Sequence, residues 1–260
     1  MTTKINNAII LAGGKGTRLA EQTKVIPKPL VKVGPDPAIF HIIRHFVKYG
    51  VTNIYIAGGY KVDLIINAFE KKFRVDNGEG TKLQVFSDSS DPIYKANIKI
   101  IDTGYSTDTA QRIKRVLAYL PDDNKETFIT YGDTFSNVNL DNVEAQLLES
   151  DNVATLTAAT FQERFGIMTI DSDNQITKFA EKSQSVNEFI NGGYIACRAS
   201  LGDYIFEDDG DFSKDTLPRL EQSGLISAYI HRGFWFPMDS QRDFEEINKI
   251  YKKNPAGFLE

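Results

Sequence analysis

Two aspartates in this sequence stand where a carboxylate could bind a metal ion. Asp133 follows the apolar segment 128–131 after one glycine, and Asp239 follows the apolar segment 234–238. A carboxylate at the carboxyl end of a parallel strand lies over the crevice where open α/β sheets bind ligands. Mg²⁺ is typically held by one or two carboxylates together with phosphate oxygens and water. The pair therefore predicts a magnesium site, although Asp133 could instead form a turn and Asp239 could cap a helix.

A glycine-rich segment near the N-terminus could bind a polyphosphate. Residues 11–19 follow the apolar run 7–12, which we expect to be a buried strand, and contain three glycines in four positions. Glycines allow a tight turn and close approach of a ligand, and the N–H groups of such a turn form an anion site. The chain carries a formal net charge of −5, yet this region is basic, which predicts a triphosphate site. Its basic residues are Lys15, Arg18, Lys24, Lys28 and Lys32.

Two common phosphate loops do not fit this segment. The Walker loop ends in Gly-Lys-Ser/Thr, and the dinucleotide loop has glycines at its first, third and sixth positions. A plain tight turn therefore remains an alternative. Lys28 favours the phosphate site because it lies between Pro27 and Pro29, which fix the backbone and present the ammonium group from a stiff segment.

The motif Gly-Gly-x-Gly-Thr-Arg-Leu at 13–19, followed by Pro27-Lys28-Pro29, resembles the signature of the sugar-phosphate nucleotidyltransferases. The resemblance covers nearly the whole chain, and later segments are most similar to the glucose-1-phosphate cytidylyltransferases of that family. It implies that a phosphate oxygen of the acceptor attacks the α-phosphorus of CTP and that pyrophosphate leaves. A phosphate monoester is mostly dianionic at neutral pH, so the reaction needs alignment and charge neutralisation rather than a general base.

The resemblance also implies roles for individual residues. The catalytic residues would be Lys28, Arg18 and Asp133, and the metal ligands Asp133 and Asp239. The nucleotide would contact Leu11, Ala12, Gly13, Gly14, Lys15, Gly16, Thr17, Arg18, Lys28, Thr109 and Arg112. The acceptor would contact Tyr131, Gly132, Arg164, Glu181, Lys182, Asn191, Gly192 and Trp235.

Two departures from the family pattern bear on specificity. Ser183 stands where the family has a proline after Glu181-Lys182, so this loop is less rigid, and such a pair could also be plain solvated surface. Ala110 and Gln111 stand where the family has glycines, which would put a side chain where backbone contacts the base. The acceptor therefore remains open between glucose 1-phosphate and another phosphorylated sugar or polyol, such as glycerol phosphate.

Length and composition indicate one large α/β domain. The chain has 260 residues, of which 41% are hydrophobic, so we expect a single nucleotidyltransferase domain over 1–260, with a nucleotide-binding half over about 1–150 and an acceptor-binding half over about 151–260. We expect a cytoplasmic homo-oligomer without nucleic-acid or membrane partners, because no long apolar run or leader is present. Cys197 should be buried, while His41 and His45 should lie on a helix surface, because they lack a third metal ligand.

The order of elements predicts a Rossmann-like, mixed but mostly parallel sheet flanked by helices. In the first half, apolar periodicity predicts strands at 7–12, 51–57, 82–86, 98–102 and 127–131 and helices at 39–47, 64–73 and 109–120. The second half should be rich in strands, at 153–161, 166–170, 175–179 and 190–197. Helices return at 201–206, 214–222 and 241–252.

Two other classes of protein remain open. A nucleotide-sugar-dependent glycosyltransferase usually needs a metal-binding Asp-x-Asp after a strand; Asp171-Ser-Asp173 fits formally but is more typical of a hairpin tip. A non-catalytic nucleotide-binding protein would not need Lys28, Asp133, Lys182 and Asp239 together. Their joint presence favours an enzyme.

Overall fold

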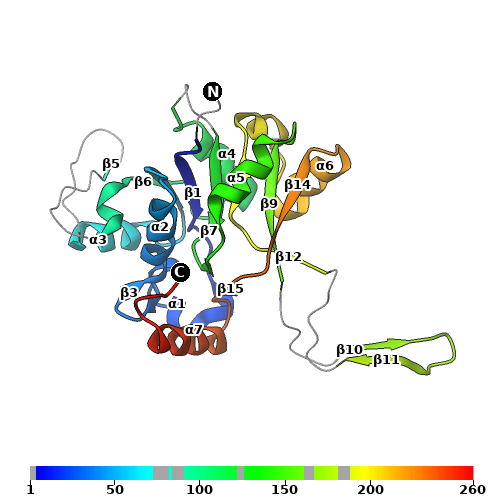
Figure 1. Cartoon of the computed structure of the whole chain (residues 1–260). Helices are drawn as coiled ribbons and strands as arrows, with labels where there is room; N and C mark the ends of the chain where they lie inside the picture. The colour runs from blue at the N-terminus through cyan, green and yellow to red at the C-terminus, as the bar shows by residue number, and fades with distance from the viewer. Residues whose placement is uncertain are drawn as a thin grey trace.

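The computed structural model of the chain describes residues 4–72, 82–83, 91–121, 126–160, 167–180 and 188–259. Among these residues the main sheet has nine strands in the order β12-β9-β13-β7-β1-β4-β6-β5, with β14 beside β9 (Figure 1). Helices cover both of its faces. The expected fold class, a mixed and mostly parallel sheet flanked by helices, is confirmed.

Strand β1 (Asn7–Leu11) lies at the centre of the parallel part of the sheet. It pairs in parallel with β4 (Asn53–Gly58) on one side and with β7 (Thr127–Tyr131) on the other. Strand β6 (Asn97–Asp102) extends the parallel part beyond β4, and β5 (Lys82–Leu83) is an antiparallel edge strand. All five residues of β1 are buried, as expected for a parallel strand covered on both faces.

Alternate residues of β1 enter two different hydrophobic cores, because successive side chains point to opposite faces of a strand. Ala8 and Ile10 belong to the core formed with α2 (Ala38–Lys48), α3 (Val62–Lys72) and α5 (Leu140–Leu148). Ile9 and Leu11 belong to the opposite core. That core is formed with α4 (Thr109–Leu117), the 3₁₀ segment Ala199–Tyr204 and α6 (Leu217–Gln222).

Strands from the second half of the chain extend the same sheet. Strand β13 (Ile195–Cys197) is antiparallel to β7 and to β9 (Ala154–Ala159), β12 (Ile190–Asn191) pairs with β9, and β14 (Ile226–His231) runs parallel to β9. The single strand expected at 190–197 is wrong. The chain turns at Gly193 and Tyr194, whose φ angles are 69° and 49°.

A third group of elements closes the lower part of the molecule in Figure 1. Strand β15 (Trp235–Pro237) pairs with β8 (Thr134–Ser136), β2 (Lys32–Val33) pairs with β3 (Asp36–Pro37), and a short α1 (Ala20–Thr23) follows the glycine-rich segment. Helix α7 (Gln241–Lys253) begins at Ser240, which forms a capping box with Asp243. The expected helix at 241–252 is confirmed, but Asp239 is not its N-cap.

Strands β10 (Ile167–Ile170) and β11 (Ile176–Ala180) form a hairpin that extends away from the main sheet (Figure 1). At its tip Asp171 Oδ1 accepts hydrogen bonds from the backbone N–H groups of Asp173 and Gln175. Asn174 adopts a φ of 61°. The expected hairpin tip is confirmed, and Asp171-Ser-Asp173 is an exposed turn.

Several local expectations are wrong or incomplete. His41 and His45 are 8% and 3% exposed, because the face of α2 that carries them is covered by Tyr251 and Phe258 near His41 and by Tyr194 near His45. The segment expected as a helix at 201–206 is a 3₁₀ turn, and α6 is preceded by a π turn at Phe212–Thr216. Helix α5 and strand β14 have no counterpart among the expected elements.

Cys197 is fully buried, as expected, and burial raises the pKa of its thiol. No helix in the part of the chain that the structure describes is long and apolar enough to cross a membrane.

The loop between the 3₁₀ segment and α6 is held by Asp209, which is 5% exposed. Its carboxylate accepts two hydrogen bonds from the Arg219 guanidinium, at 2.7 and 2.8 Å, and others from Thr216 Oγ1 and the N–H of Phe206. The Arg219 hydrogen bonds, with those from Thr216 and Phe206, lower the pKa of Asp209 to about 2. These bonds order the loop that continues into residues 210–216.

Asp209→Asn should lower the free energy of unfolding at neutral pH by about 1–3 kcal/mol, because an amide cannot pair with the guanidinium. The pKa is about 2 in the folded chain and about 3.9 in unfolded chains. The folded state therefore binds this proton less tightly, so the stabilisation is complete above about pH 4 and is lost as the pH falls toward about 2. Urea unfolding of both proteins at several pH values measures the difference. A difference that stays constant down to low pH would contradict the assignment, and Asp208→Asn, on the exposed part of the loop, is the control.

Candidate active site

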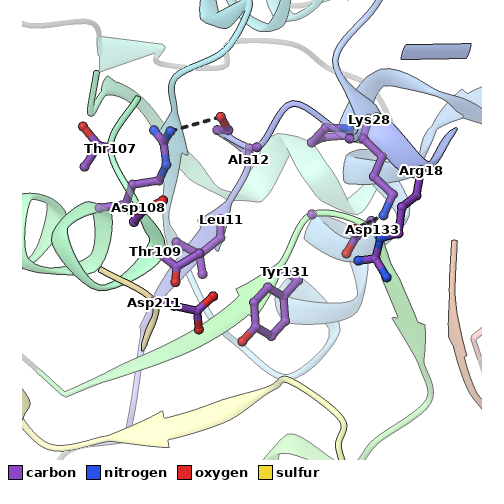
Figure 2. Close-up of a pocket in the computed structure, with 16 residues that line it drawn as sticks. Leu11, Ala12, Arg18, Lys28, Thr107, Asp108, Thr109, Tyr131, Asp133 and Asp211 are labelled. Carbon is purple, nitrogen blue, oxygen red and sulfur yellow. Dashed lines mark hydrogen bonds and ion pairs between the residues drawn. The ribbon is translucent and has the colours of Figure 1, made fainter. Parts of the chain in front are cut away.

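A cleft of about 330 Å³ lies over the carboxyl ends of β1 and β7 (Figure 2). Its walls come from the glycine-rich segment, the turn at 28–29, the start of α4, the residues after β7, and the loop before α6. The lining residues are Leu11, Ala12, Gly13, Gly14, Gly16, Arg18, Lys28, Pro29, Thr107, Asp108, Thr109, Arg112, Tyr131, Gly132, Asp133 and Asp211. The structure thus brings together most of the residues predicted to bind the nucleotide.

The glycine-rich segment turns sharply at Gly16, which has a φ of 61°. The Gly16 carbonyl accepts hydrogen bonds from Thr23 Oγ1 and from the N–H of Leu19, at 2.9 and 3.0 Å. Gly14 faces open space, so its surroundings leave room for a ligand. Two predicted nucleotide-binding residues, Lys15 and Thr17, are not among the described residues that line the cleft. The Lys15 ammonium group lies 5.1 Å from the centre of the Tyr105 ring.

Arg112 holds this segment from within the protein. The residue is 3% exposed, and its guanidinium donates hydrogen bonds to the Gly13 carbonyl (3.0 Å), the Gly58 carbonyl (2.8 Å) and Thr103 Oγ1 (2.5 Å). A Cβ on Gly13 or on Gly59 would overlap the guanidinium. These two glycines are therefore required by the close approach of Arg112. Arg112, which was predicted to bind the nucleotide, lines the cleft, but these hydrogen bonds go to other groups of the protein.

Lys28 lies between the two aspartates that the sequence singled out. Its ammonium group forms ion pairs with Asp133 and with Asp239 Oδ1, the latter at 2.6 Å, and Arg18 Nη1 lies 3.3 Å from Asp239 Oδ2. Lys28 is 8% exposed. Burial lowers the pKa of Lys28, but the two carboxylates more than offset this effect, so the pKa is raised. The lysine is therefore charged at neutral pH.

The arrangement of the two carboxylates fits a divalent cation. Both bind the same ammonium group, so both can reach one positive centre. The described residues form no group of three or more histidine, cysteine, aspartate or glutamate side chains that could enclose a metal ion. Two carboxylates are nevertheless sufficient for Mg²⁺, which usually completes its shell with phosphate oxygens and water.

Five of the predicted acceptor residues belong to the part of the chain that the structure describes. Tyr131 and Gly132 line the cleft, and a Cβ at Gly132 would lie 3.0 Å from the Leu11 carbonyl oxygen, so this position needs glycine. Trp235 Nε1 donates to the Gly192 carbonyl at 2.8 Å, and Asn191 Oδ1 accepts from the N–H of Gly193 at 3.0 Å. These contacts join the end of β12 to β15.

Three predicted acceptor residues, Arg164, Glu181 and Lys182, lie outside the described residues, as does Ser183. Their expected roles remain predictions from the sequence.

Thr109 and Gln111 have contacts that the sequence did not indicate. Thr109 lines the cleft, and its Oγ1 accepts a hydrogen bond from the N–H of Phe212 at 2.8 Å. The Gln111 side chain donates to the carbonyls of Phe206 and Asp209, and Ala110 is buried. The expectation that the side chains at 110 and 111 enter the nucleotide site is therefore wrong, because both point away from the cleft.

Sequence reasoning missed three residues of the cleft: Thr107, Asp108 and Asp211. Asp108 could have been found, since it directly precedes the helix-forming segment and stands at the N-cap of α4. Asp211 could not have been found from the sequence. Its loop is held beside the cleft by the hydrogen bond from the N–H of Ala110 to the carbonyl of Gly210, two residues about one hundred positions apart in the chain.

The fold and the cleft are typical of one class of protein, the α/β enzymes that bind their ligands at the carboxyl ends of parallel strands. The chain belongs to the nucleotidyl transferase family, which it matches over residues 7–254. The glucose-1-phosphate cytidylyltransferases of Salmonella typhi and Salmonella typhimurium are each 34% identical to it over 254 residues, covering 96% of this chain and 97% of the relative. The crystal structure of HddC from Yersinia pseudotuberculosis has the same fold, with a TM-score of 0.70 at 23% identity, and covers 95% of this chain and all of HddC. The chain is a sugar-phosphate nucleotidyltransferase.

Gly13→Ala should destabilise the protein by about 1–3 kcal/mol, because the added methyl group displaces the Arg112 guanidinium from a well-packed place. Gly14→Ala is the matched control. Its Cβ would meet nothing within 4 Å, so its effect should stay within about 0.5 kcal/mol. Urea unfolding without ligand measures both. Equal effects of the two substitutions would show that Arg112 does not constrain the loop.

Proposed function

We propose that this enzyme joins CTP and a sugar 1-phosphate, most simply glucose 1-phosphate, to give a CDP-sugar and pyrophosphate. The 34% identity to the Salmonella cytidylyltransferases over nearly the full length of both chains supports the choice of substrates. The observation that carries the catalytic assignment is the cluster of Lys28, Asp133 and Asp239 beside the glycine-rich segment. It combines a cation for phosphate with two carboxylates for a metal.

The triphosphate would lie along the glycine-rich segment, with Arg18 and Lys28 at its negative charges. A divalent cation held by Asp133 and Asp239, which we take to be Mg²⁺, would neutralise phosphate charge during transfer. The carboxylates would then be occupied by the cation, and the Lys28 ammonium group would be free to pair with a phosphate oxygen. Lys28 thus exchanges one set of anionic partners for another while remaining charged.

The acceptor would bind on the side of Tyr131, Asn191 and Trp235, with its phosphate toward Asp133. Arg164, Glu181 and Lys182 would complete that side. In this proposal residues up to about 150 carry most of the nucleotide site and the remaining residues most of the acceptor site. No general base is required, because the attacking phosphate is already mostly dianionic at neutral pH.

A release assay for pyrophosphate tests the proposal. The protein is incubated with Mg²⁺, each of CTP, UTP, dTTP, GTP and ATP, and a panel of glucose 1-phosphate, other sugar 1-phosphates and glycerol phosphate. We expect CTP with glucose 1-phosphate to give the highest rate. A higher rate with glycerol phosphate would show that the acceptor is a polyol phosphate rather than a sugar 1-phosphate. The absence of pyrophosphate with every pair would overturn the proposal and favour a non-catalytic nucleotide-binding protein.

Asp133→Asn and Asp239→Asn should each abolish turnover while the protein remains folded, because each removes one negative charge from the cation site. Steady-state pyrophosphate release and thermal unfolding measure the two properties. Asp141→Asn is the control, since Asp141 is exposed and pairs with Lys4. Near wild-type rates for either cleft variant would remove that residue from the site.

Lys28→Ala should lower kcat by about 10²- to 10³-fold and raise KM for CTP less, if the ammonium group acts on charge that develops during transfer. Lys32→Ala, an exposed lysine on the neighbouring strand β2, is the control and should leave both constants nearly unchanged. A change confined to KM would instead assign Lys28 to ground-state binding.

A further inference from the structure

The end of the cleft opposite the phosphate-binding groups is acidic. Figure 2 shows Arg18, Lys28 and Asp133 on one side, Tyr131 in the middle, and Thr109, Asp108 and Asp211 on the other side. A nucleotide with its triphosphate at the glycine-rich segment would therefore extend past Tyr131 toward Asp211. The acidic end is where its base would lie.

Only one of the two carboxylate oxygens of Asp211 accepts hydrogen bonds from the described residues. Oδ1 accepts hydrogen bonds from the N–H groups of Ser213 and Lys214, at 2.9 and 3.2 Å. Oδ2 makes no hydrogen bond to any described residue. The side chain is only partly exposed and lines the cleft, so Oδ2 is an available acceptor held in a defined place.

The backbone around Asp211 is fixed from two sides. Phe212 N–H donates to Thr109 Oγ1 at 2.8 Å, which ties the residue after Asp211 to the first turn of α4. The N–H groups of Gly210 and Asp211 both donate to Asp215 Oδ2 at 2.8 Å. The carboxylate is thus pre-positioned, and a ligand does not have to order it on binding.

Asp108 adds a second carboxylate to this wall. It stands at the N-cap of α4, where an aspartate usually accepts a hydrogen bond from the helix backbone, but its side chain makes no such bond. The neighbouring guanidinium groups donate elsewhere, Arg112 to Gly13, Gly58 and Thr103 and Arg115 to Thr103 and Thr107. The negative charge at this end is therefore not neutralised by a direct ion pair among the described residues.

We propose that Asp211, with Asp108 beside it, selects the base of the nucleotide by accepting a hydrogen bond from an exocyclic amino group; the inference rests on the proposed function and refines it. Cytosine carries an amino donor at C4, whereas uracil and thymine carry a carbonyl oxygen at the same position. A carboxylate attracts the first and repels the second. The acidic wall accordingly favours CTP over UTP and dTTP.

The ratio of kcat/KM for CTP to kcat/KM for UTP tests this assignment. In Asp211→Asn the amide oxygen can still cap Ser213 and Lys214, while the amide N–H₂ replaces the free acceptor with a donor to a carbonyl. We expect the ratio to fall by about 10- to 100-fold, the discrimination of one charge-assisted hydrogen bond, with a smaller fall in Asp108→Asn. Asp208→Asn is the matched control, because Asp208 is exposed on the same loop and does not line the cleft.

The ratio does not depend on how much of a variant is folded, since both nucleotides are measured on the same preparation. Equal losses of kcat/KM for CTP and for UTP would overturn the assignment. They would show that the carboxylate contacts a group that both nucleotides share, such as the ribose. An unchanged ratio, or a wild-type enzyme without preference for CTP, would also overturn it. Calorimetry of CTP and UTP binding to the same proteins needs no turnover. It therefore tests base selection even if the proposed catalytic function is wrong.

Discussion

The burial of Lys28 is the constraint on which the site depends. The charge of a lysine that is only 8% exposed must be neutralised, and its partners, Asp133 and Asp239, lie 105 and 211 residues away in sequence. Asp133 follows the last residue of strand β7 after one glycine, and the pairing of β8 with β15 brings Asp239 close to it. The bond from Met238 N–H to the Asp133 carbonyl, at 3.0 Å, fixes the two segments together. Phe135 and Met238, which lie on these two segments, are buried in one hydrophobic cluster with Ile247 of α7, and this packing supports the pairing.

A second buried cation organises the other side of the cleft. Arg112 joins the carbonyls that follow β1 and end β4, so the glycine-rich segment is supported from beneath. Contacts inside the protein thereby explain Gly13 and Gly59, whereas a Cβ at Gly14 would meet no neighbouring atom. At the Lys28 end of the cleft each carboxylate is paired with a cation, whereas Asp108 and Asp211 form no ion pair among the described residues. This difference favours one orientation of an elongated ligand.

The sequence alone determined the class of fold and most of the phosphate-binding end. Apolar runs such as 7–12 and 127–131 and the helical periodicity of 39–47 predicted the central parallel strands and α2, because local patterns report which elements are buried on both faces. Gly13 and Gly14 follow the expected strand at 7–12, and Asp133 follows the expected strand at 127–131 after one residue. Parallel strands deliver their carboxyl ends to the same edge of a sheet, so this part of the site could be predicted without coordinates.

Only the tertiary structure decided the contacts between segments that no local pattern connects. Asp211 enters the cleft through bonds to α4 across about one hundred residues, and Arg112 and Gln111 turn toward carbonyls whose positions depend on the packed fold. His45 is buried, although its sequence position looked exposed, because Tyr194 lies against it in a turn with positive φ. Periodicity records which face of a helix is apolar, but it carries no information on which distant side chain covers that face. Side-chain direction and long-range pairing therefore appear only once the whole chain has packed.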